Sequence, residues 1–167
     1  MKRFFVCFLC LTALLSLLSA CRADYRQDLA PTTIADYIES ELSSGTAYRN
    51  LDDKSSFYGG AFDLESVDHF ALRVAEDGSN LDEFGIFSCT DEEGAKALEK
   101  EIKNYLAFLY KTNREWYLSY IPEEVPKLQN AEVKTYGRYV AYAILSENDR
   151  NRLFDLIKQK LLQIKEA

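Results

Sequence analysis

The residue types that most often carry metal or nucleophilic chemistry are scarce in this sequence. It contains one histidine, His69, and four cysteines. A structural zinc site needs several cysteine or histidine ligands at short spacings, and the cysteine nearest to His69 is Cys89, twenty residues away. The sequence also lacks a G-x-S-x-G elbow, a P-loop and a glycine-rich dinucleotide fingerprint. We therefore expect no metal and no cofactor, and we assign no catalytic residues.

Carboxylates are the second kind of candidate, because paired acids can transfer protons or hold calcium. Two groups stand out, Asp52-Asp53 and the stretch DGSNLDE that runs from Asp77 to Glu83. The second group is similar to a calcium loop, but it lacks the twelve-residue spacing with a terminal glutamate. We therefore interpret it as a solvated turn.

Aromatic residues form the third candidate, and they gather before Pro122. Trp116, Tyr117 and Tyr120 follow Tyr110 within a short stretch. Aromatic rings with polar tips suit glycan stacking or protein interfaces. The alternative is that they pack the end of a helix against a sheet. We take Trp116, Tyr117 and Tyr120 as a candidate interaction surface.

The amino-terminal residues 1–20 have the three parts of a secretory signal peptide. Lys2 and Arg3 form a basic head, residues 4–18 carry no charge, and Ser19 and Ala20 are small. The alternative is a permanent membrane anchor, but a spanning helix needs about 20 apolar residues.

The end of this segment, Leu18-Ser19-Ala20-Cys21, resembles the lipobox of bacterial lipoproteins. The resemblance implies that the Cys21 thiol receives a diacylglyceryl group and becomes the mature amino terminus. Two acyl chains give stable anchoring where one chain holds a protein only marginally. Cleavage after Ala20 that leaves a free thiol is the alternative. Residues 21–30 are then a lipidated cysteine and a polar tether.

Removal of residues 1–20 changes the charge and the cysteine count of the chain. It leaves 147 residues, which contain 18 of the 20 basic residues and all 27 acidic residues, so the net charge is about −9. Nucleic acid is not expected as a partner, because phosphate binding needs a basic face. Cys7 and Cys10 leave with the signal peptide and Cys21 is alkylated, so Cys89 has no disulfide partner. We expect Cys89 to be buried.

The periodicity of the remaining chain predicts alternating helices and strand pairs. A helix begins at Pro31, and Thr90 with Glu93 forms a capping box before the longest helix, which must end before Pro122. Ser146 caps the last helix, with Asp149 at its third position. Four strands are expected, and the first of them is half-buried: Val67–Val74, Glu83–Cys89, Ala131–Tyr136 and Tyr139–Leu145.

These elements define a fold class. Two hairpins around a long helix predict about four antiparallel strands with helices packed on the sheet, an α+β architecture in the order α-ββ-α-ββ-α. We expect residues 31–167 to form one domain, since this length suffices for a single core.

Three segments of the chain resemble the bacterial lipoproteins that carry the domain of unknown function 4358. They are Glu83–Phe87, Tyr120–Glu124 and Gly137–Val140, within a similarity that covers roughly residues 31–150. Phe84 stands where an aliphatic residue is more usual in that family. The resemblance implies a lipoprotein of Gram-positive bacteria, and it implies no catalytic or binding residues because the family has no assigned activity.

Together these observations predict a membrane-tethered extracytoplasmic lipoprotein that acts as a binding or assembly module rather than as an enzyme. Its partners are the cell membrane, through the lipid on Cys21, and an unidentified protein or glycan. Two alternatives stay open. One is an enzyme that acts on cell-wall or extracellular glycans through acidic residues, and the other is a small-ligand carrier for a transporter.

Overall fold

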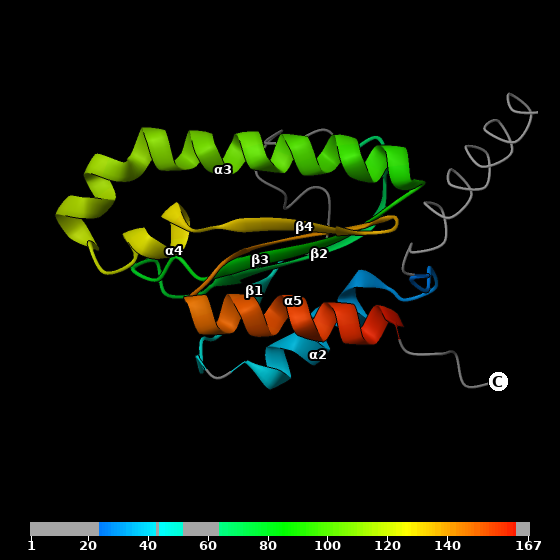
Figure 1. Ribbon diagram of the computed structural model, residues 1–167. Coiled ribbons are helices and arrows are strands. Elements are labelled where there is room, and N and C mark those ends of the chain that lie inside the picture. Colours follow the sequence, from blue (N-terminus) through cyan, green and yellow to red (C-terminus); the bar gives the residue numbers. More distant parts are fainter. Residues whose placement is uncertain (1–23, 43, 52–63, 163–167) are drawn as a thin grey trace, which may run out of the picture.

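The computed structural model describes residues 24–42, 44–51 and 64–162. Cys21 and the Asp52-Asp53 pair lie outside these residues. The described chain forms a five-stranded sheet with helices on both sides (Figure 1). The elements are α2 (Pro31–Glu41), β1 (Tyr48–Asn50), β2 (Val67–Ala75), β3 (Glu83–Cys89), α3 (Glu92–Tyr120), α4 (Val125–Gln129), β4 (Glu132–Tyr136), β5 (Tyr139–Ile144) and α5 (Glu147–Leu162).

The α+β class and the four expected strands are confirmed, and the sheet gains one strand. Its order is β1-β2-β3-β5-β4, and every neighbouring pair is antiparallel. The extra strand, β1, pairs three residues with the end of β2 at the edge of the sheet. A strand of three residues is too short to show the alternation that reveals strands in a sequence.

Helices cover both faces of the sheet, with α3 on one face and α2 and α5 on the other (Figure 1). All residues of β3 and β5 are buried in consequence. The expectation that β2 is half-buried is wrong, because its residues from Phe70 to Arg73 are all buried. Arg73 faces α2, where its guanidinium pairs with Asp36 and Glu39.

A bulge in β2 adjusts which side chains face α3. The register with β3 shifts between Val67 and His69. A bulge adds one residue to a strand, so Val67 and Phe70 lie in the same cluster under α3 although they are three residues apart. A strict two-residue alternation would place them on opposite faces.

The ends of the helices confirm one predicted cap and correct another. Asp91, not Thr90, is the N-cap of α3, and its carboxylate accepts a hydrogen bond from the Gly94 amide. The Ser146 hydroxyl accepts from the Asp149 amide as expected. Both residues satisfy amide groups that the first helical turn leaves without backbone partners.

Cys89 is buried as predicted, with no exposed surface. Burial disfavours the thiolate, and together with the charges of Asp68 and Asp91 it raises the pKa of the Cys89 thiol to about 11. The side chain therefore belongs to the core and is a weak nucleophile at neutral pH.

Candidate functional site

Helix α3 is longer than the sheet that it covers. Its 29 residues span about 43 Å, whereas the longest strand, β2, has nine residues and spans about 30 Å. The buried residues of α3 all lie in its first half: Ala95, Leu98, Ile102 and Leu106. Leu109 and Tyr117 of the second half still pack partly against the core cluster of the sheet, whereas the last turns extend past the sheet and curve toward α4 (Figure 1).

This overhanging part of α3 exposes large apolar side chains. Trp116 is 54% exposed and Tyr120 is 68% exposed. The ring centroids of Trp116 and Tyr120 are 4.9 Å apart, and Tyr117 packs edge-on against Trp116 at 5.4 Å. The structure therefore brings together the three predicted residues, Trp116, Tyr117 and Tyr120, as an aromatic cluster. Its two outer rings do not pack against the sheet.

Next to the aromatic cluster lies a cavity of about 430 Å³ between α3 and the β2–β3 turn. Tyr117 belongs to both features, since it also lines the cavity. The α3 side of the cavity is aromatic and aliphatic, and the side formed by the turn and strand β3 is polar. Lining residues include Tyr105, Leu109, Asp77, Asn80, Asp82 and Glu83.

Glu83 is a buried carboxylate on the sheet side of this cavity, with 8% of its surface exposed. The Tyr142 hydroxyl donates a hydrogen bond to it from β5. Gly85, opposite Tyr142 in the register, leaves room for the tyrosine ring, because a Cβ there would lie 2.5 Å from it. Burial and the charge of Glu83 both raise the pKa of Tyr117.

Asp82 has a different set of partners, which joins three segments around the cavity. Its carboxylate forms an ion pair with Lys127 of α4 at 2.8 Å and accepts a hydrogen bond from the Thr46 hydroxyl at 2.7 Å. Lys127 also pairs with Glu124 at 2.7 Å, and Glu124 accepts from the Leu81 amide. These contacts hold α4 and the residues before β1 against the β2–β3 turn.

The stretch Asp77–Glu83 is therefore only partly the solvated turn that we expected. Asp77 fits that expectation, since it is exposed and hydrogen bonds from the Ser79 amide and hydroxyl lower its pKa. Asp82 and Glu83 do not fit, because they are buried. The carboxylates point to different partners, and the described residues contain no group of three or more histidine, cysteine or acidic side chains placed to hold a metal ion.

Comparison with known proteins places the chain in a family. A family model described as domain of unknown function DUF4358 matches residues 54–145, more than half of the chain. The chain belongs to the DUF4358 family. No curated protein and no solved structure matches it. In this DUF4358 protein, one segment that carried the resemblance, Glu83–Phe87, supplies Glu83 to the cavity wall. A second, Tyr120–Glu124, is joined to that wall because Glu124 accepts a hydrogen bond from the amide of Leu81, a lining residue.

The described residues also bear on the membrane. None of their helices is both long enough and apolar enough to cross a bilayer. Helix α3 has sufficient length, but charged side chains run along it.

Replacement of Lys127 by methionine tests the polar network. Burial lowers the pKa of Lys127, but its bonds to Asp82 and Glu124 outweigh burial, so the net shift is upward from 10.5. A lysine whose pKa is higher in the folded state than in the unfolded state stabilises the protein fully at pH values below the unfolded-state pKa. This stabilisation is lost as the pH rises through the folded-state pKa. We expect Lys127→Met to lower the free energy of unfolding by about 1–3 kcal/mol at pH 7, because it leaves buried Asp82 without its cation.

Urea unfolding at several pH values measures this effect. The deficit should shrink as pH rises above about 10.5, since the wild-type lysine then loses its charge. Lys103→Met removes the exposed ion pair with Glu99 and should cost no more than about 0.5 kcal/mol. Equal losses in the two variants, or a loss at Lys127 that does not change with pH, would contradict the role of the network.

Proposed function

We propose that this DUF4358 protein is a lipid-anchored binding module that holds glycans on the outer face of the cell membrane. One observation carries the proposal: the exposed Trp116 and Tyr120 rings lie beside a cavity with a polar wall. Flat aromatic surfaces stack on the apolar faces of sugar rings, and neighbouring polar groups bind the hydroxyls. Tyr117 links the two features, so one oligosaccharide can contact both.

The polar wall of the cavity fits hydroxyl-rich ligands. Glu76 and Asp77 belong to the β2–β3 turn and supply carboxylate oxygens at the cavity. Carboxylate and amide oxygens accept hydrogen bonds from sugar hydroxyls, and bonds to charged acceptors are the stronger ones.

The charge of the chain narrows the class of glycan. The part after residue 20 carries a net charge of about −9, and the cavity is lined by four acidic residues and one arginine: Glu76, Asp77, Asp82, Glu83 and Arg49. Polyanionic polymers would be repelled. Neutral glycans, or glycans with protonated amino groups that pair with the carboxylates, are the favoured ligands.

The proposed location follows from the amino-terminal residues. A basic head, an apolar stretch and Cys21 after Ser19-Ala20 fit export followed by lipidation. The two acyl chains of a diacylglyceryl group suffice for stable attachment. Since the acidic domain has no electrostatic attraction to anionic headgroups, the lipid supplies the anchoring.

A small-ligand carrier is the second candidate, and the cavity favours it. A volume of about 430 Å³ lies within the range of pockets that hold small molecules. A carrier would bind one small molecule in the cavity without the aromatic cluster. The binding module would instead gain affinity as an oligosaccharide becomes long enough to reach Trp116.

Ligand titration of the purified protein tests glycan binding. Trp116 is the sole tryptophan of the chain, so its fluorescence reports directly on the aromatic cluster. We expect a saturable shift in emission with oligomers of N-acetylglucosamine or glucosamine. In calorimetric titrations, Trp116→Ala should weaken binding at least about tenfold, as expected for a central aromatic anchor.

Phe108→Ala is the matched control for this titration. Phe108 lies on the same helix and is 62% exposed, but it is outside the aromatic cluster. It should change affinity less than about twofold. No saturable binding of either oligomer, or equal losses in the two variants, would overturn the glycan-binding proposal.

Cys21→Ala tests the anchor separately. The variant should lose incorporation of labelled fatty acid and should leave the membrane fraction, because the thiol that accepts the lipid is absent. The urea midpoint of the released protein should equal that of the wild type. An unchanged midpoint shows that the release does not come from misfolding. Unchanged retention in the membrane fraction would show that Cys21 does not anchor the protein.

A further inference from the structure

We infer that the domain stands on the membrane in one orientation, with the β4–β5 turn toward the lipid headgroups and the aromatic cluster pointing away. This inference rests on the proposed lipid on Cys21. It goes beyond anchoring, because a flexible tether would let the domain tumble. The structural basis is the way in which residues 24–30, here called the entry segment, are bound to the domain.

The backbone of the entry segment is bound at three places to elements far away in the sequence. The Arg26 amide donates to the Leu161 carbonyl of α5 at 2.9 Å. The Arg138 guanidinium donates to the Gln27 carbonyl at 2.8 Å. The Tyr139 hydroxyl donates to the Leu29 carbonyl at 2.7 Å. The chain between Arg26 and Leu29 therefore lies along the β4–β5 turn.

Side chains reinforce this attachment. Tyr25 packs edge-on against Tyr136 with ring centroids 5.5 Å apart, and Tyr25 and Leu29 both extend the core cluster of α2 and α5. Gly137 has φ of +60°, a conformation that favours glycine. A Cβ at Gly137 would also lie 2.7 Å from Gln27 Nε2, so the Gln27 amide group would have to shift.

The proposed anchor is close to this attachment. Cys21 precedes Tyr25 by four residues, and four extended residues reach at most about 14 Å. The headgroup layer of one leaflet is about 5–8 Å thick. A lipid on Cys21 therefore brings the β4–β5 turn to the headgroups or very near to them.

The charges of this edge are only partly offset. Arg26 pairs with Asp28 at 2.9 Å, and Arg138 pairs with Asp68 at 2.9 Å. Asp91 and Glu93 lie at the same end of the molecule, so the edge stays acidic. The lipid on Cys21, and not electrostatic attraction, therefore holds this edge at the headgroups.

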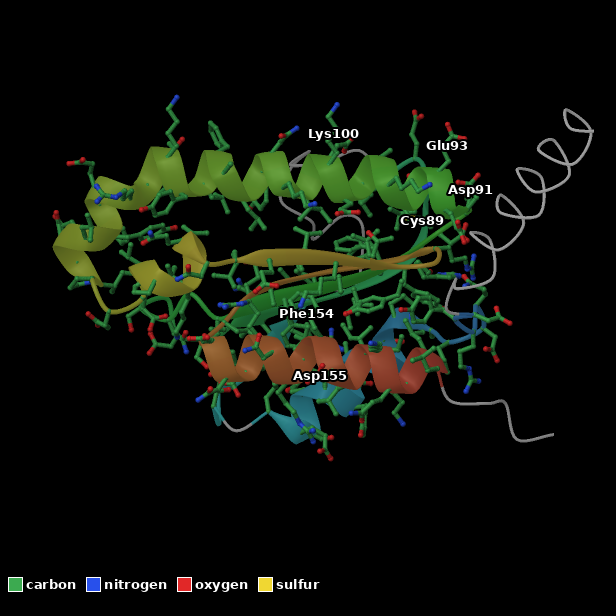
Figure 2. All side chains as sticks on the ribbon, in the orientation of Figure 1. Cys89, Asp91, Glu93, Lys100, Phe154 and Asp155 are labelled. Carbon is green, nitrogen blue, oxygen red and sulfur yellow. The ribbon has the colours of Figure 1, made fainter. Side chains whose placement is uncertain are left out.

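The direction of α3 then decides where the binding site points. Its N-cap, Asp91, lies at the same end of the molecule as the β4–β5 turn, since the amide of neighbouring Cys89 donates to the Arg138 carbonyl. Figure 2 shows Asp91 and Glu93 at this end. The aromatic cluster lies at the other end of α3, roughly 40 Å away. The orientation presents the proposed glycan site well clear of the membrane.

Energy transfer to lipid headgroups in vesicles tests the orientation on the full lipidated protein. Donor dyes are placed at Glu93→Cys and, separately, at Glu115→Cys, with acceptor dyes on headgroups. The two positions lie on α3, 22 residues or about 33 Å apart. Buried Cys89, whose thiol pKa is raised to about 11, stays unlabelled. We expect transfer to be at least threefold more efficient from position 93.

Two further variants separate the possible failures. Insertion of ten glycine and serine residues after Cys21 lengthens the reach and should bring the two efficiencies closer together. Equal transfer from both positions in the lipidated protein without the insertion would overturn the orientation while the anchor stands. Undiminished transfer from position 93 after Cys21→Ala would overturn the anchor, and with it the orientation.

Discussion

The burial of the central strand pair β3 and β5 on both faces determines the architecture. Every residue of the two strands is buried, so the apolar faces of helices must lie on each side of the sheet. Helices α2 and α5 together cover one face, and α3 covers most of the other. Because one helix does this alone and is longer than the strands, its last turns, which carry Trp116 and Tyr120, extend past the sheet. The exposed aromatic cluster is a direct consequence of this mismatch in length.

The cavity arises at the same end of the molecule, where α3 leaves the sheet. Polar side chains that face it from the sheet and the turn need partners, because buried charges are costly alone. Tyr142 donates a hydrogen bond to Glu83, and Lys127 forms an ion pair with Asp82. These pairs keep acidic groups at the cavity without collapse of its walls. The glycan-binding proposal depends on this combination: an aromatic surface for stacking lies beside carboxylate oxygens that can accept hydrogen bonds.

Much of this fold could be predicted from sequence periodicity, whereas the contacts between distant segments could not. The spacing of Leu98, Ile102 and Leu106 predicts α3, and Ser146 marks the start of α5. The aromatic cluster can be predicted from the closeness of its residues in the sequence, but its exposure depends on where the sheet ends. The burial of Asp82 was missed because its partner, Lys127, lies 45 residues away in a helix of five residues, which is too short to show a periodic pattern. The expected tether at residues 24–30 contacts β5 through Tyr139, 110 residues later.

Hydrogen exchange along α3 tests the central claim, that the helix consists of a part packed on the sheet and an overhanging part that binds ligand. Amides near Leu98 and Ile102 should exchange at the rate of global unfolding, since packing protects them. Amides near Trp116 should exchange much faster, and a bound glucosamine or N-acetylglucosamine oligomer should slow that part alone. Uniform protection along α3, or slowing by the oligomer in the packed part only, would contradict the account.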